Sequence, residues 1–128
     1  MRTAALFAAC LLSHACGGSV GNTPRETPDF VGKVWVSPEP SAPRGTLRIF
    51  LPDGTLLMDS CWETYRLARW ETVADRRIAW TEDTARIEAE VVRAAADQLD
   101  LRLHLVGGIK NESYRLATVP FVCPDMPR

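Results

Sequence analysis

The chain has 128 residues, enough for a single domain, and its formal net charge at pH 7 is −1. Because 15 basic residues stand against 16 acidic ones, the chain lacks the positive excess of a nucleic-acid-binding surface, and we expect no nucleic-acid partner. Four Trp, four Phe and two Tyr supply volume for one modest core.

The N-terminus has the order of features that is typical of a signal peptide. Arg2 gives a positive start, residues 4–12 are apolar, and small residues follow. The apolar run is shorter than the ~20 residues that a transmembrane helix needs. We therefore expect residues 1–15 to be a signal peptide that is removed on export. The alternative, a buried or amphipathic N-terminal helix, fits this order less well.

Cys16 follows Ser13-His14-Ala15 and precedes two glycines, and this stretch resembles the lipobox of bacterial lipoproteins. That family prefers an aliphatic residue where this chain has Ser13, and the same tripeptide would also serve an ordinary signal peptidase. The resemblance implies that Cys16 is the lipid attachment site. It further implies an exported protein that is anchored by N-terminal acyl chains in a membrane of the cell envelope, facing the periplasm or the cell exterior.

The four cysteines are not equivalent. Cys10 lies in the apolar leader and leaves with it. If Cys16 is acylated, Cys61 and Cys123 are the one pair left for a disulfide in an oxidising compartment. If Cys16 is not acylated, a free thiol remains on a flexible tail. We expect a disulfide between Cys61 and Cys123 that ties the C-terminal tail to the domain.

Residues 16–29 are rich in Gly, Pro, Ser and Thr without apolar periodicity, which predicts a flexible tether before a domain over 30–128. From residue 30 onward the hydrophobic pattern has a period of two, which indicates strands. Short connections favour antiparallel hairpins, so we expect an all-β meander. The expected strands cover about 31–37, 45–51, 54–61, 64–71, 77–82, 84–92, 98–106 and 112–119.

Three details of this pattern carry expectations of their own. In 45–51 the leucines and isoleucine alternate with Arg48 and Phe50, and we expect the aliphatic set to face inward. Pro52-Asp53-Gly54 predicts a turn. Residues 84–97 place charged residues on one helical face, but strict alternation over 85–91 favours a strand.

Eight short antiparallel strands suggest an up-and-down barrel, because closure removes exposed edges. Gly32-Lys33-Val34-Trp35 is similar to the Gly-x-Trp opening of lipocalin-like domains, with one extra residue. Residues 50–55 resemble the Phe-x-x-Asp-Gly-Thr hairpin of small bacterial lipocalin-like lipoproteins, and residues 65–80 resemble the hairpin that follows it. The resemblance spans about 31–119 and implies a small, roughly eight-stranded lipocalin-like barrel with room for one small apolar ligand.

A second family remains open. Residues 60–65 resemble the Gly-Cys-Asn-x-Tyr hairpin of META-type domains, although the Gly and Asn are missing and Tyr65 is displaced by one position. A helix over 84–97 would favour that family.

The sequence offers no catalytic or metal-binding constellation. His104 is the one histidine after the leader, the cysteines have no Cys-x-x-Cys spacing, and Glu82-Asp83 is interpreted as a solvated turn. We therefore expect no enzyme, no metal and no cofactor.

Trp35, Trp70 and Trp80 are candidates for stacking against a ligand, with ordinary core packing as the alternative. We expect a non-catalytic structural or protein-interaction module of the cell envelope, with the barrel interior filled by its own side chains. The alternative is a lipocalin-like binder of a small apolar ligand.

Overall fold

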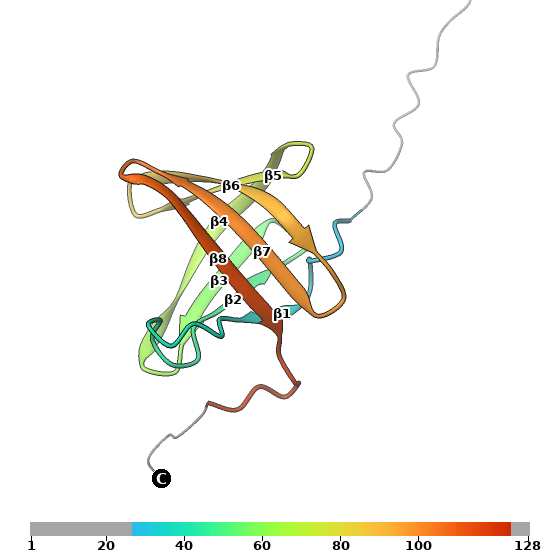
Figure 1. Cartoon of the computed structure of the whole chain (residues 1–128), viewed down its shortest axis with the longest axis vertical. Coiled ribbons are helices and arrows are strands. Elements are labelled where there is room, and N and C mark those ends of the chain that lie inside the picture. The colour runs from blue at the N-terminus through green and yellow to red at the C-terminus, as the bar shows by residue number, and fades with distance from the viewer. Residues whose placement is uncertain (1–26, 124–128) are drawn as a thin grey trace, which may run out of the picture.

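A computed structural model describes residues 27–123. The expected signal peptide (1–15), the lipid-attachment residue Cys16 and all but the last three residues of the tether lie outside the described residues. The described chain forms eight strands and no helix (Figure 1). The strands are β1 (Val34–Val36), β2 (Leu47–Phe50), β3 (Thr55–Ser60), β4 (Glu63–Ala74), β5 (Arg77–Glu82), β6 (Ala85–Ala94), β7 (Gln98–Leu105) and β8 (Gly108–Leu116).

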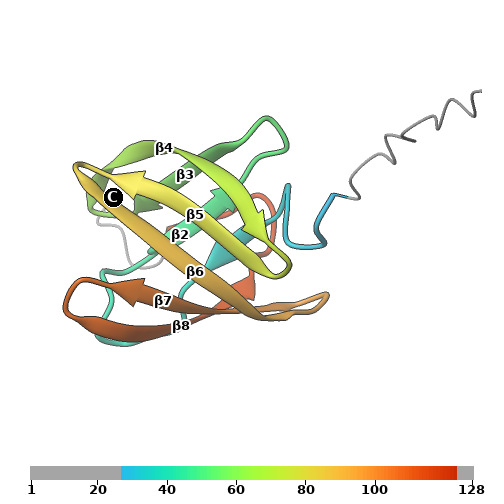
Figure 2. The ribbon, with the colours of Figure 1, turned by 90° about the horizontal axis from the view of Figure 1, so that it is seen from above.

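The strands close into a barrel in sequence order. Each pairs antiparallel with the next, and β8 pairs antiparallel with β1. Viewed from above, β3 and β4 lie on one side of the barrel and β7 and β8 on the opposite side (Figure 2). This confirms the predicted all-β meander and its closure.

Alternation of buried and exposed side chains explains the strands in the second half of the chain. On β6, Ile87, Ala89 and Val91 are buried, whereas the residues between them are exposed or half-buried. A stripe with period two is buried efficiently by a strand and not by a helix. The strand predicted for 84–92 is thereby confirmed over the helical alternative.

The predicted turn between β2 and β3 forms at residues 52–54. Gly54 has φ +84°, a conformation that side chains with a Cβ rarely adopt. Asp53 Oδ1 accepts a hydrogen bond of 2.9 Å from the Thr55 backbone N–H, and hydrogen bonds from Thr55 hold the pKa of Asp53 below its usual value. Local polar contacts therefore fix this hairpin.

The expected orientation of β2 is wrong. Phe50 is fully buried, and its ring lies 5.5 Å from that of Trp70 and 6.4 Å from that of Trp80. Arg48, two residues earlier, also points into the barrel, whereas Leu47 and Ile49 lie on the outer side. Both sides of β2 are apolar enough to be buried, so alternation alone does not orient the strand. The large aromatic ring fills the interior.

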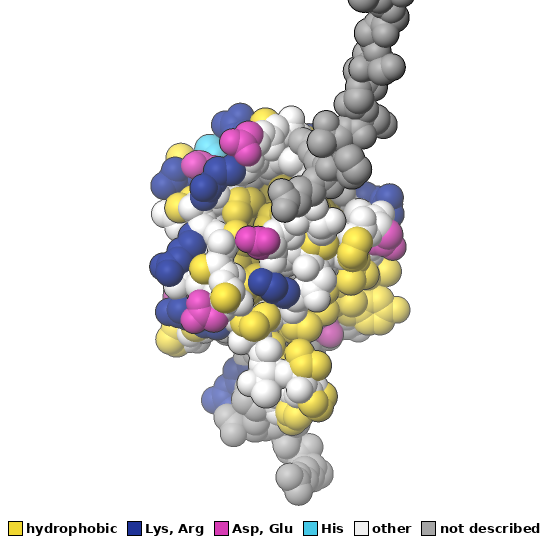
Figure 3. All heavy atoms as spheres, turned by 90° about the vertical axis from the view of Figure 1, so that its right-hand side faces the viewer, with side chains coloured by type: hydrophobic (Ala, Val, Ile, Leu, Met, Phe, Trp, Pro, Cys, Tyr) yellow, Lys and Arg dark blue, Asp and Glu magenta, His cyan; other side chains and the backbone are white. Residues whose placement is uncertain are grey.

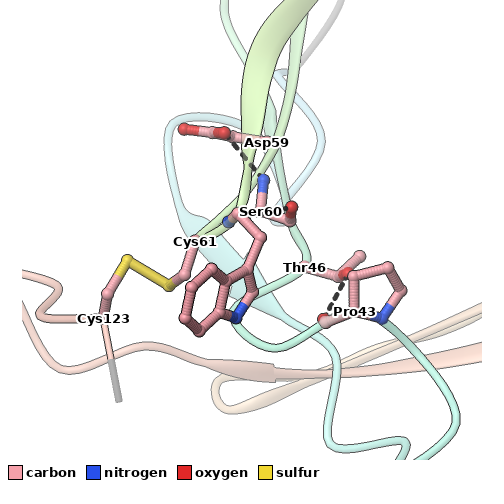
Figure 4. The surroundings of a disulfide bond; sticks show 7 residues. Pro43, Thr46, Asp59, Ser60, Cys61 and Cys123 are labelled. Atoms are coloured by element: carbon pink, nitrogen blue, oxygen red, sulfur yellow. Dashed lines mark hydrogen bonds between the residues drawn. A yellow bond between two sulfur atoms is a disulfide. The ribbon is translucent and has the colours of Figure 1, made fainter. Parts of the chain in front are cut away.

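The C-terminal segment 117–123 crosses the outside of the barrel, and we call it the C-terminal strap. Ala117 donates a backbone hydrogen bond of 2.9 Å to the carbonyl of Val34. The strap ends at Cys123, which forms a disulfide with Cys61, just after β3, with Cα atoms 5.6 Å apart (Figure 4). The predicted Cys61–Cys123 disulfide is therefore present.

Candidate functional site: a polar cavity and an apolar outer face

One end of the barrel opens into a cavity of about 530 Å³. The long connection between β1 and β2 forms part of its wall. The rest comes from the end of β3, the beginning of β4, the end of β5 and residues 110–114 of β8. Five acidic and three basic side chains line it, so its surface is polar rather than apolar.

Arg48 of β2 forms the floor of this cavity. Its Nε donates a hydrogen bond of 2.7 Å to the hydroxyl of Tyr114, on the far side of the interior. Its Nη2 lies 3.1 Å from Glu112 Oε2, and its guanidinium lies 5.1 Å from the centre of the Trp80 ring. Burial alone would lower the pKa of Arg48, but the neighbouring Tyr114 and Glu112 raise it above its ordinary value. Arg48 therefore stays charged inside the barrel.

Glu112 and Tyr114 lie two residues apart on β8, so both point toward Arg48. The Tyr114 hydroxyl donates a hydrogen bond of 2.5 Å to Glu112 Oε2, and Lys110 Nζ lies 2.8 Å from Glu112 Oε1. Burial opposes the charge of Glu112, but Arg48 and the hydrogen bonds from Lys110 and Tyr114 hold its pKa below the usual value. Burial and the charge of Glu112 raise the pKa of Tyr114 well above its ordinary value.

Glu82 adds a second carboxylate to the floor. Its Oε1 accepts a hydrogen bond of 2.8 Å from the indole N–H of Trp80 and lies 3.7 Å from Arg48 Nη1. Glu82 is the last residue of β5, and its side chain is only 20% exposed. The interpretation of Glu82 as a solvated turn residue is therefore wrong, because Trp80 and Arg48 hold its carboxylate over the barrel interior.

The charged and polar groups on the floor of the cavity compensate one another. Among residues 27–123, no buried side-chain nitrogen or oxygen lacks a hydrogen-bond partner. An apolar molecule placed on the floor would cut these charges off from water without offering hydrogen bonds, which is unfavourable. The cavity therefore suits water or a polar molecule.

The three tryptophans predicted as ligand-stacking residues do not line this cavity. Trp35 and Trp80 are almost fully buried, and Trp70 is partly buried against the core. The indole N–H of Trp35 donates to the Phe30 carbonyl at 2.8 Å, and that of Trp70 donates to the Leu51 carbonyl at 3.0 Å. A molecule in the cavity would meet Arg48 before it reached Trp80.

A second feature lies on the outside of the barrel. Four outward side chains, one on each of β1 to β4, are paired directly across the sheet: Val34 with Ile49, Ile49 with Leu57, and Leu57 with Leu67. We call this row and its apolar neighbours Val36, Leu47 and Tyr65 the outer apolar face. Leu67 and Tyr65 are each about 60% exposed. Figure 3 shows hydrophobic side chains gathered on the right of its view, the side turned away from the reader in Figure 1.

The opposite side of the barrel has a different character. The outward residues of β6 and β7 are largely charged and form ion pairs, among them Arg102 with Glu90 at 3.0 Å. Charged side chains of this kind are typical of a surface that faces water. The contrast between the two sides makes the outer apolar face unusual for this molecule.

The pattern of the sequence does not predict that Arg48, Glu82, Glu112 and Tyr114 form a group. They lie on β2, β5 and β8, and only barrel closure brings them together. The available signal was weak: an arginine in an otherwise apolar strand, and Glu112 and Tyr114 in the same phase of β8.

Residues 27–123 contain no cluster of three or more His, Cys, Asp or Glu side chains arranged to hold a metal ion. Within the same range, no helix has the length and apolar character needed to cross a membrane. Comparison of the chain with protein-family models, curated proteins and solved structures found no match.

Proposed function

We propose that this protein is an exported, lipid-anchored module of the cell envelope that does no chemistry and acts by contact with another macromolecule. The observation that carries the proposal is the outer apolar face. The outward residues of this part of the sheet are Val34, Ile49, Leu57 and Leu67. Burying these apolar side chains against a partner lowers the free energy, because it removes apolar surface from water without removing polar groups from water.

The packing of the interior supports contact rather than carriage of an apolar molecule. Aromatic and aliphatic side chains of the barrel itself fill the core, and Phe50 joins Trp70 and Trp80 in edge-to-face contacts. The open space lies instead at the charged end of the barrel.

Export and anchoring rest on the sequence of the leader. The positive start, the apolar run of residues 4–12 and the lipobox-like stretch before Cys16 support a lipoprotein. The tether that follows would let the barrel reach partners near the membrane surface. The resemblance to small lipocalin-like lipoproteins agrees with this placement.

The experiment that tests contact is photo-cross-linking in the cells that make the protein. A benzophenone amino acid at position 67 should give a defined protein adduct that mass spectrometry identifies, since Leu67 is well exposed at the β4 end of the apolar row. The matched control is position 109, because Ile109 on β8 is similarly exposed at 64%. Equal labelling at both positions, or none at either, would contradict the proposal.

The cavity supports a second candidate function, binding of a small polar molecule. A volume of about 530 Å³ and a floor built from Arg48, Glu82, Glu112 and Tyr114 favour a polar ligand over the apolar one that the sequence suggested. Native mass spectrometry of the protein isolated from cells should then detect bound mass. Arg48→Met should lose that mass, and retention by the variant would contradict this function.

A further inference from the structure

We infer that the outer apolar face binds a second copy of this chain, so that two barrels pack face to face about a twofold axis. This inference rests on the proposed function, since it names the partner of the same surface. Three features carry it: the apolar row across four neighbouring strands, the charges on either side of that row, and the arrangement of the C-terminal strap.

The row is suited to packing against itself. Val34, Ile49, Leu57 and Leu67 occupy one line across four neighbouring strands. A twofold axis that runs along this line places each residue over the same residue of the second copy, with the strands of the two sheets antiparallel. Flat apolar sheet faces pack in this way at about 10 Å separation. The contact is isologous, which is the common way for a chain to pair with itself.

The charges beside the row are complementary under the same axis. Arg69 is paired with Thr55, and Asp59 lies four residues further along β3, so the two charges are ~13 Å apart along the strands and on opposite sides of the apolar row. The twofold rotation reverses the strand direction but keeps each strand over its own copy. It therefore brings Arg69 of one chain next to Asp59 of the other, on the neighbouring strand, at both ends of the interface.

The C-terminal strap leaves this part of the face open. Phe121 shares a surface hollow with Val36 and Gly45, at the edge of the face near the disulfide. Leu47, which lies at this edge of the outer apolar face, is 8% exposed, whereas Leu67 in the central row is 60% exposed. The strap thus lies beside Val36 at one margin of the face and leaves the central row for another molecule.

A membrane surface is a poorer match for the same face. Lipid headgroups with negative charge attract several basic side chains. Within the described residues, the charges nearest the central row balance one another. Arg69 has Asp53 of the neighbouring turn within electrostatic reach, and Asp59 lies on the other side of the row, where Arg115 of β8 is paired with Val36. A surface with both signs of charge suits a partner that carries the same charges in reversed order better than it suits an anionic membrane.

Cysteine cross-linking tests the axis directly. In Leu67→Cys the two new thiols would lie close to each other across the axis, so a short bis-maleimide should convert most of the mature, cell-purified protein to a covalent dimer. Ile109→Cys is the matched control and should stay monomeric, because its side chain lies on the other side of the barrel with similar exposure. The unsubstituted chain, treated in parallel, gives the background labelling.

A charge exchange tests the pairing without disturbing the apolar row. Arg69→Asp alone and Asp59→Arg alone should each weaken the dimer several-fold in sedimentation equilibrium, because each places like charges together. The double variant should recover the wild-type dissociation constant. Leu67→Glu should raise that constant at least about tenfold, and Ile109→Glu should leave it unchanged.

Several outcomes overturn the inference. A wild-type chain that stays monomeric at 100 μM (roughly the weak end of specific association) would do so, as would equal cross-linking of Leu67→Cys and Ile109→Cys. A cross-link from position 67 to a different protein, to lipid or to residues 124–128 of the same chain would also overturn it. A cross-link to a different protein leaves the proposed contact function standing. A cross-link to lipid or within the chain, with no protein adduct, contradicts that function as well.

Discussion

Gly45 lies directly against the disulfide, in the connection that enters β2. Its φ is +71°, and a Cβ built on it would overlap the Sγ of Cys61. Gly45→Ala should therefore destabilise the protein by about 1–3 kcal/mol, since a left-handed alanine alone costs ~1–2 kcal/mol. Urea unfolding at pH 7 measures the change.

The control for this substitution is Gly107→Ala. Gly107 has no other heavy atom within 4 Å of a built Cβ, so the added methyl group meets nothing. Its unfolding midpoint should stay close to that of the wild type. If both alanine variants lose the same stability, the contact between Gly45 and the disulfide is not the cause.

Glu112 makes a pH-dependent contribution to stability. Its pKa in the folded protein is held below its usual value, so it favours folding above its unfolded pKa of about 4.3. This contribution is lost as the pH falls through the lower, folded pKa. Glu112→Gln should therefore cost more stability at pH 7 than at pH 3, measured by urea unfolding of both proteins. An equal cost at the two pH values would refute this role.

For single residues, the sequence predicts the burial of apolar side chains better than the burial of charged ones. The buried set Leu99, Leu101 and Leu103 follows directly from alternation. Arg48 does not, because its inward position depends on Glu112 and Glu82, which lie on strands far away in the sequence. A charge is tolerated in an interior only when partners compensate it, and the sequence does not name those partners.

Among the elements, the strands with one apolar side were predicted almost to the residue. β5 (Arg77–Glu82) matches its expected range and β7 (Gln98–Leu105) ends one residue earlier than expected. Polar residues mark most of the outer side of each strand, Ala79 of β5 excepted. β2 has large apolar residues on both sides, Phe50 on one and Leu47 and Ile49 on the other, and its orientation was predicted wrongly. β8 ends at Leu116, earlier than expected, because the chain leaves the sheet there and continues as the C-terminal strap.

The strap depends on the disulfide between Cys61 and Cys123. The bond joins residues 62 apart in sequence, and a loop of that length restricts the unfolded chain by about 4 kcal/mol in the chain-entropy model. Reduction should lower the thermal unfolding midpoint, and Cys123→Ser should lower it by a similar amount without reductant. A Cys123→Ser variant as stable as the oxidised wild type would contradict this account.

For the molecule as a whole, anchoring depends on Cys16. Two or more acyl chains give stable membrane attachment, whereas one is marginal. Cys16→Ser should therefore move the protein from the membrane to the soluble fraction of lysed cells. Cys10→Ser is the control, because Cys10 lies within the predicted leader, and it should leave the distribution unchanged. A wild-type protein found in the soluble fraction would contradict the prediction.

The barrel is closed by a short pairing between β1 and β8, which we call the joint. β1 has three residues, and only Trp35 and Val36 are paired with β8, whereas β7 and β8 are paired along their full lengths. The C-terminal strap begins at this joint, where Ala117 bonds to Val34, and is fixed beyond it at Cys61. The disulfide therefore fastens the chain across the place where the cylinder would part most easily.

Reduction of the Cys61–Cys123 disulfide should then let β1 and β8 separate transiently, so that the barrel opens. Hydrogen exchange can follow this local unfolding. The Ala117 amide, which bonds across the joint, should exchange faster after reduction, while the Val91 amide on β6, which bonds to Arg76, should keep its rate. Each opening would expose two strand edges able to pair with other chains. Oxidation would thus protect this protein from aggregation as well as from unfolding.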